Sequence, residues 1–180
     1  MRWKTLSFLL VSLAACSPAA TGANRPVPAY GGRSAELFDD AIEARAVGLD
    51  PEAAGSVRGD STFRERVQLA DAALRVRVDT VTSKQEDTGT SYQVGFRVID
   101  KLAGVHPPPE AFSVKVDRTS PSSGILKSYE SQLVGKRFIA FVRLFGAPDG
   151  DRDYHFHLAP DTKDVEAAVR EATILENFKN

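Results

Sequence analysis

The stretch Arg137-Phe138-Ile139-Ala140-Phe141-Val142-Arg143-Leu144-Phe145 is a nearly continuous apolar run. A strand with one face in solvent alternates apolar and polar residues, whereas a strand covered on both faces reads as a continuous apolar run. The run therefore predicts a central strand over 137–145 that has protein on both faces. A chain of 180 residues, 42% of them hydrophobic, is long enough to supply that cover within one domain.

Alternating segments on both sides of this run predict four further strands. In the first of them, 69–82, Leu74, Val76 and Val78 alternate with charged residues. Gly95 lies in the middle of the second predicted strand, 91–102, where a glycine predicts a bulge or a bend. The other three strands follow the same two-residue period and are expected at 91–102, 112–116 and 154–158.

Helical patterns occur before, between and after these strands. A helix over 35–47 is predicted to end at Gly48. A short helix over 124–133 separates the third strand from the fourth. Asp161 or Thr162 is expected to cap a terminal helix whose apolar residues repeat at helical spacing.

The predicted order is three strands, a short helix, two strands and a terminal helix. This is the topology of an OB fold, a five-stranded, partly open Greek-key barrel. The sequence thus predicts a mostly β protein with helices: a five-stranded OB-like barrel with an N-terminal helix and a C-terminal helix, in a single domain over 34–180. An α+β roll and a small β-sandwich are the alternatives.

Three strand patterns resemble the netrin-type branch of OB folds, which includes metalloproteinase inhibitors. They are Ala70–Val78, Phe96–Gly104 and Val134–Val142, and the resemblance covers about residues 63–158. Those inhibitors carry several disulfides and a metal-chelating N-terminal Cys, whereas this chain has one Cys. The resemblance implies the fold and leaves a netrin-like protease-inhibitor module as an alternative function.

The first sixteen residues carry an export signal. Arg2 and Lys4 form a short basic region, and residues 6–13 are apolar but shorter than the roughly 20 residues that span a bilayer. The run ends in Leu13-Ala14-Ala15-Cys16, which resembles the lipobox of bacterial lipoproteins. The resemblance implies a signal peptide over 1–15 and a mature chain that begins at a lipid-modified Cys16. An ordinary secretory signal with an incidental Cys is the alternative.

Residues 16–33 are expected to join this anchor to the folded part. They are rich in Pro, Gly and small side chains, which is typical of a flexible tether. Two or more acyl chains on Cys16 would make membrane attachment permanent. Ser17 stands where lipoproteins held at the inner membrane tend to carry Asp, so the resemblance implies the cell outer membrane, with the domain facing the periplasm.

The net charge and the absence of known enzyme motifs from the sequence argue against several classes of function. The chain has 23 Lys and Arg against 24 Asp and Glu, a formal net charge of −1, so no overall positive field attracts nucleic acid. Nucleophile-elbow, phosphate-loop, dinucleotide-binding and zinc-protease motifs do not occur in the sequence. We therefore expect a protein that is not an enzyme, needs no cofactor and binds no nucleic acid.

Two histidines near the C-terminal end of the predicted sheet, with a neighbouring aspartate, are the strongest candidates for a metal site. Alternation along a strand places Asp153, His155 and His157 on one face, about 6–7 Å apart. Two imidazoles and a carboxylate are suitable ligands for zinc or copper. The alternative is the polar, solvent-exposed face of a strand whose other face packs inward.

Basic residues on the first three strands suggest a second candidate surface. Arg75, Arg77, Arg97 and Lys115 occupy outward positions, and these strands form the usual ligand face of an OB fold. A basic platform for an anionic polymer, such as an envelope polysaccharide, is one interpretation. A surface of mixed charge is the other, because aspartates are interleaved at 79, 100 and 117.

Three functions follow from these observations. The leading one is a lipid-anchored, non-enzymatic binding or adaptor module for another envelope protein or polysaccharide. The second is a metal-binding periplasmic lipoprotein that uses His155 and His157. The third is the netrin-like inhibitor.

Overall fold

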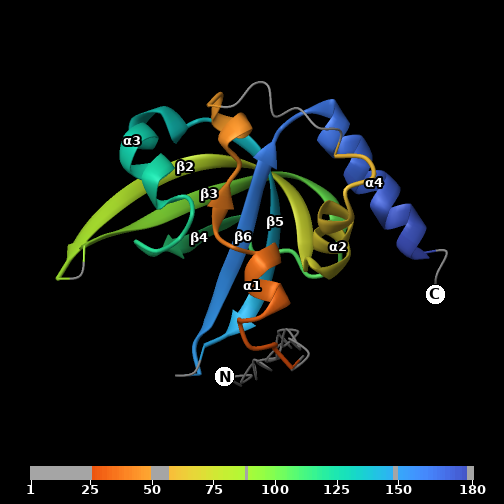
Figure 1. The fold of residues 1–180 in the computed structure, drawn as a ribbon, viewed down its shortest axis with the longest axis horizontal. Helices are drawn as coiled ribbons and strands as arrows, with labels where there is room; N and C mark the ends of the chain where they lie inside the picture. The colour runs from red at the N-terminus through yellow and green to blue at the C-terminus, as the bar shows by residue number, and fades with distance from the viewer. Residues whose placement is uncertain (1–25, 50–56, 88, 148–149, 178–180) are drawn as a thin grey trace, which may run out of the picture.

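The computed structural model describes residues 26–49, 57–87, 89–147 and 150–177, which form a curled six-stranded sheet with helices around it (Figure 1). The strand order is β1-β6-β5-β2-β3-β4. β1 runs parallel to β6, and every other neighbouring pair is antiparallel. The prediction of a mostly β protein with helices is confirmed. The predicted number of five strands is too low, because β1 adds an edge to β6.

The strands are β1 (Ala41–Ile42), β2 (Ala72–Glu86), β3 (Gly89–Gly104), β4 (Ala111–Val116), β5 (Arg137–Gly146) and β6 (Arg152–Pro160). The helices are α1 (Arg33–Leu37), the 3-10 turn η1 (Ala44–Val47), α2 (Ser61–Leu69), α3 (Ser123–Leu133) and α4 (Lys163–Asn177). Among the described residues, no helix is both long and apolar enough to cross a bilayer.

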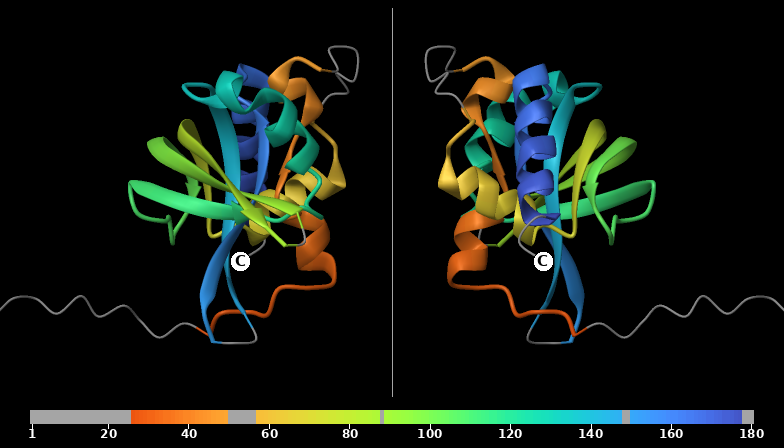
Figure 2. Two further views of the ribbon diagram at one scale, coloured as in Figure 1. Left: turned by 90° about the vertical axis from the view of Figure 1, so that its left-hand side faces the viewer. Right: turned by 90° about the vertical axis from the view of Figure 1, so that its right-hand side faces the viewer.

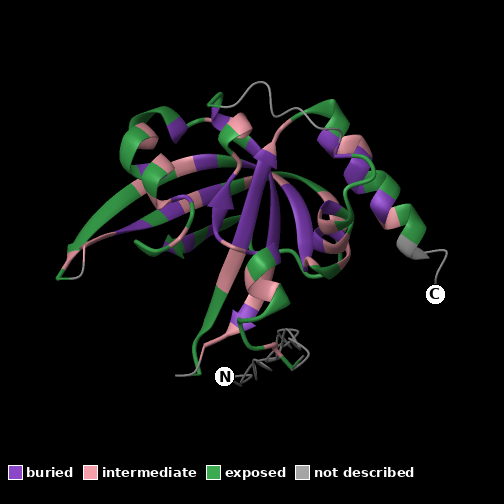
Figure 3. Cartoon of the chain, viewed as in Figure 1, coloured by how far each residue is buried: buried purple, intermediate pink, exposed green. Residues whose placement is uncertain are grey.

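β5 is buried on both faces, as its apolar run predicts. Phe138 and Ala140 point into a core on the concave side of the curled sheet. Ile139 and Phe141 point into a second core on the convex side. All four side chains have no exposed surface, and Figure 3 shows the centre of the sheet as buried. The strand thus joins two hydrophobic cores through one backbone.

Different elements close the two cores. The concave core is completed by residues of α3 and of the β1–η1 segment. The convex core is completed by α1, α2 and α4, and Figure 2 shows α2 and α4 side by side on that face. The helices therefore cover mainly the side of the sheet on which β5 presents Ile139 and Phe141.

The predicted helix over 35–47 is wrong. α1 ends at Leu37, and Asp40 adopts a left-handed conformation with φ 53°. The Asp40 N–H then donates to the Phe156 carbonyl at 2.9 Å, and the Glu43 N–H donates to the Leu158 carbonyl at 2.9 Å. The chain leaves the helix because pairing with β6 satisfies these amides. Only the predicted end at Gly48 holds, with φ 82°.

The other helices follow local sequence signals. α3 and α4 lie where the sequence predicts them, and the Thr162 hydroxyl accepts a hydrogen bond from the Val165 N–H at 3.3 Å. Residues 63–69 belong to α2, whose N-cap Asp60 accepts from the Thr62 N–H at 2.8 Å. Gly95 lies at a register shift between β2 and β3, which confirms the predicted bulge.

Two glycines with positive φ test the close packing where β2 and β3 meet. A Cβ on Gly104 (φ 93°) would lie 2.3 Å from the Asp71 carbonyl oxygen, whereas a Cβ on Gly135 (φ 85°) would meet nothing within 4 Å. Both alanine variants bear the cost of a left-handed residue, about 1 kcal/mol. We expect Gly104→Ala to lower the free energy of unfolding in urea by at least about 1 kcal/mol more than Gly135→Ala. Equal losses would contradict the described packing.

Candidate functional site

The N-terminal strap, residues 26–49, crosses β6 and the end of β5. Its first part belongs to the predicted tether 16–33, yet it lies on the folded body: the Gly146 N–H donates to the Pro28 carbonyl at 3.0 Å, and Ala29 bridges to Gly146. Its later part supplies α1, β1 and η1. The folded body therefore begins before residue 34, the boundary that composition predicts.

Carboxylates of the strap contact both histidines of β6. Asp40 lies 2.8 Å from Nδ1 of His155. Asp39 lies 2.8 Å from Nδ1 of His157, and Glu43 lies 3.2 Å from its Nε2. The polar face of this strand is exposed at Asp153, but the strap covers it at His157 and leaves that side chain only 10% exposed.

Aromatic contacts fix the ring of His155. The Tyr30 ring stacks on it with centroids 3.5 Å apart and planes within 4°. Phe145 meets both rings edge to face, at 5.2 Å from Tyr30 and 5.6 Å from His155. The Tyr30 hydroxyl donates to the Phe38 carbonyl at 2.8 Å. These contacts hold the first described part of the strap on β6.

The pKa values of the strap reflect burial beside opposite charge. Burial raises the pKa of Asp40, although His155 and the Phe156 N–H act in the other direction. Burial also opposes ionisation of Asp39, but there the hydrogen bond and the charge of His157, together with a backbone hydrogen bond and the charge of Arg66, outweigh burial and lower the pKa. Burial and the nearby Asp40 raise the pKa of Tyr30 to about 12. The cluster is thus a set of partly desolvated charges held by mutual contact.

A second positive group anchors the same strap. Arg66 of α2 is buried and donates from Nε to the Leu37 carbonyl at 2.7 Å. Burial lowers the pKa of this guanidinium, and the charges of Asp39 and Glu43 act against that change. Arg66 therefore ties the end of α1 to α2 and lies within the field of the carboxylates.

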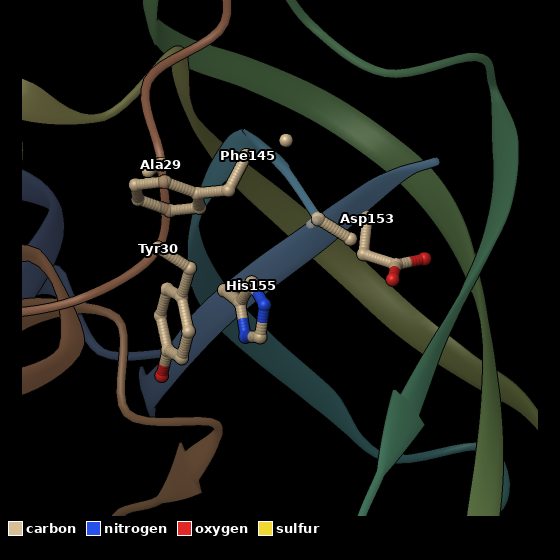
Figure 4. Close-up of a pocket in the computed structure, with 7 residues that line it drawn as sticks. Ala29, Tyr30, Phe145, Asp153 and His155 are labelled. Carbon is tan, nitrogen blue, oxygen red and sulfur yellow. The ribbon is translucent and has the colours of Figure 1, made fainter. Parts of the chain in front are cut away.

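A pocket of about 300 Å³ opens beside this cluster (Figure 4). In Figure 4 the rings of Tyr30 and His155 face each other, and the carboxylate of Asp153 points away from them. Aromatic walls with a few polar groups are typical of small-molecule sites. The residues that line the pocket are Ala29, Tyr30, Phe145, Gly146, Ala147, Asp153 and His155.

The three predicted metal ligands do not converge. Both ring nitrogens of His157 and the Nδ1 of His155 contact carboxylates of the strap, and the Asp153 carboxylate points elsewhere. Within the described residues, no group of three His, Cys, Asp or Glu side chains could hold a metal ion. Zinc or copper binding by these residues stays a prediction.

Arg75, from the predicted basic platform, is neutralised by acidic residues. Its guanidinium lies 2.8 Å from Asp161, 2.8 Å from Glu166 on α4 and 3.3 Å from Asp100. Hydrogen bonds with Asp161 and Glu166 raise the pKa of this arginine. Arg75 therefore joins the sheet to α4 and adds little free positive charge.

The other basic candidates also have acidic partners. Arg77 and Arg97 both contact Asp79, at 2.9 and 2.8 Å. Lys115 lies 3.0 Å from Asp117. The arrangement matches the surface of mixed charge that the interleaved aspartates predict, and binding of an anionic polymer here stays a prediction.

Strap residues were absent from the sequence-based candidates. Tyr30, Asp39, Asp40 and Glu43 supply the carboxylates and the stacked ring that contact the two histidines. One signal was present: the acidic pair Asp39-Asp40 interrupts an apolar run. Buried acids require partners, but the sequence does not show which residues supply them.

Comparison of the chain with models of known protein families finds no match, and comparison with curated proteins finds none either. Cys16 lies outside the described residues. Its lipidation, and the outer-membrane location that depends on it, rest on the sequence.

Acid unfolding tests the pair Asp39 and His157. Because the pKa of Asp39 is lowered in the fold, its contribution is present above the ordinary value of 3.8 and is lost as the pH falls through the lower folded value. We expect Asp39→Asn to cost about 1 kcal/mol at pH 7 and progressively less on acidification toward pH 3. Urea unfolding at several pH values measures this. Asp153→Asn, at an exposed position of β6, is the control, and a cost for Asp39→Asn that is independent of pH would contradict the pairing.

Proposed function

We propose that this chain is a lipid-anchored, non-enzymatic binding module of the bacterial cell envelope, attached to the outer membrane through Cys16 and facing the periplasm. The observation that carries the proposal is the order of basic residues, short apolar run and Leu13-Ala14-Ala15-Cys16 at the start of the sequence. Its partner is another envelope protein or a polysaccharide.

The pocket beside the strap supports a binding role. Two of its lining residues, Ala29 and Tyr30, follow Cys16 closely in the sequence, so the pocket lies where the proposed tether joins the folded body. Its aromatic walls and the imidazole of His155 suit a small ligand or a protruding side chain of a partner. The inhibitor alternative rests on the fold resemblance alone.

We also propose that the five long strands are an OB-like barrel left open on one side. Their order, β6-β5-β2-β3-β4, with α3 inserted between β4 and β5, supports this assignment. β4 and β6 are the two ends of that series, and the rings of Phe112 and Tyr154 approach to 5.8 Å across the opening.

Substitution of Cys16 tests the anchor. Cys16→Ser removes the thiol that accepts the lipid, so metabolic labelling with a fatty-acid analogue is expected to mark the wild type and not the variant. A block of lipoprotein processing should make the wild type accumulate as a heavier precursor. The matched control is Ser17→Ala, which leaves the thiol in place and should keep the label.

Two outcomes would overturn the proposal. Label retained by Cys16→Ser would place the lipid elsewhere, and an unlabelled wild type would remove the anchor. The binding role is tested separately, by crosslinking in intact envelopes and capture of the tagged native protein. Recovery of the chain without any crosslinked envelope protein or polysaccharide would contradict it.

A further inference from the structure

The side chains that line the pocket beside the strap offer a ligand acceptors rather than donors. The Tyr30 hydroxyl already donates to the Phe38 carbonyl at 2.8 Å. Nδ1 of His155 lies 2.8 Å from the Asp40 carboxylate and donates to it, so Nε2 of the neutral imidazole is an acceptor. The Asp153 carboxylate accepts as well, and the remaining lining side chains are apolar. The pocket therefore suits a ligand that brings its own N–H or O–H donors.

Carboxylates beside the pocket favour a ligand with positive charge. Asp40 lies behind His155, and its side chain is only 9% exposed. Burial raises the pKa of Asp40, so its present partners compensate the carboxylate charge incompletely. Asp153 is exposed, and Lys115 interacts with it, but the ion pair of Lys115, at 3.0 Å, is with Asp117. A cation in the pocket would stabilise both Asp40 and Asp153.

Phe145 already packs against one guanidinium, that of Arg143. The guanidinium carbon lies 5.4 Å from the centre of the Phe145 ring and 6.0 Å from that of Phe38. Guanidinium groups are attracted to the faces of aromatic rings. Arg143 does not line the pocket. Its charge opposes a second cation, but the carboxylates of Asp40 and Asp153 outnumber it.

The part of the pocket between His155 and Asp153 fits one planar group. The Tyr30 ring stacks on one side of His155 at 3.5 Å, and Asp153 lies on the other side (Figure 4). Asp153 and His155 are two residues apart on β6, which is roughly 6–7 Å along a strand. A planar group stacked on the free side of the imidazole would thus lie midway between the ring and Asp153. Phe145, opposite Asp153 on β5, forms a wall of this space.

We propose that this part of the pocket binds a guanidinium group, the side-chain group of arginine. The group would stack on His155 and pair with the Asp153 carboxylate, which is exposed and can rotate toward it from the orientation in Figure 4. A guanidinium is planar, matches a carboxylate and is weakly hydrated, whereas the ammonium of lysine is compact and strongly hydrated. The proposal rests on the binding role proposed above and names the group that the pocket recognises.

A titration with butylguanidinium tests the site with a small probe. The protein is the full chain with Cys16→Ser, so that a lipid does not interfere. We expect the NMR signals of the His155 imidazole and of the Tyr30 and Ala147 amides to shift, with a dissociation constant of about 1–10 mM. Butylurea has nearly the same shape without the charge, and it should bind at least about tenfold more weakly.

Two substitutions separate the site from the overall charge of the protein. Asp153→Asn removes the carboxylate of the site and should weaken butylguanidinium binding about threefold, as expected for one exposed ion pair. Asp87→Asn is the matched control: it removes the same charge between β2 and β3 and should leave binding unchanged. Both positions are exposed, so neither change disturbs a core.

Three results would overturn the proposal. They are the absence of shifts at the pocket residues, butylurea binding as tight as that of butylguanidinium, and equal weakening by Asp153→Asn and Asp87→Asn. The peptide acetyl-Gly-Arg-Gly-amide distinguishes the sources of the group. Tighter binding of the peptide than of butylguanidinium indicates a partner protein, and equal or weaker binding indicates a free guanidinium compound; either result supports the site.

The titration uses purified protein, so its outcome is independent of lipid attachment and of capture from the envelope. Failure of the titration alone would overturn the guanidinium site and leave the anchor and the binding role standing. Binding of the probe without a crosslinked envelope partner would retain the site and contradict the proposed function.

Discussion

The structure depends on the burial of β5 on both of its faces. Phe138 lies in the concave core and Phe141 in the convex core, and neither has exposed surface. Burying a side chain of this size contributes about 1.5–3 kcal/mol. Because the second face of β5 is apolar, α1, α2 and α4 have a surface to cover. The α1 part of the strap packs on this side, and its β1–η1 part completes the concave core. A strand with one polar face would leave these segments without a site of attachment.

Apolar burial and charged contacts together hold the strap on the folded body. Leu37 and Phe38 are fully buried in the convex core, and the acids that follow are brought with them into a partly desolvated position. Removing a carboxylate from water is costly unless it is paired and hydrogen-bonded. His155 and His157 supply those partners for Asp40 and Asp39. If Cys16 carries the lipid anchor, the strap connects that anchor to β6. The pocket then lies beside the place where the strap contacts β6.

Local signals in the sequence were sufficient for the strands and insufficient for the strap. The two-residue period of β2 and the continuous apolar run of β5 express burial directly, so both were predicted. The helix over 35–47 was predicted wrongly because distant residues decide the conformation of Asp40 and Asp39. The partner of Asp40, His155, is 115 positions further along the chain, and the partner of Asp39, His157, is 118 positions further along. The same distance hid the candidate site: alternation along β6 aligned the histidines, but the covering carboxylates come from another segment. Arg75 likewise pairs with Asp161, which precedes α4, and with Glu166, which lies in α4. Tertiary packing determines these pairs, so the sequence did not show them.

We infer that the strap belongs to the same cooperative unit as β5. Native-state hydrogen exchange of the Asp40 and Glu43 amides tests it most directly, because these amides donate to β6 at Phe156 and Leu158. We expect both amides to exchange only through global unfolding, with the same free energy of opening as the amides of β5. Exchange of the strap amides at the rate of an unstructured peptide, while β5 stays protected, would contradict it.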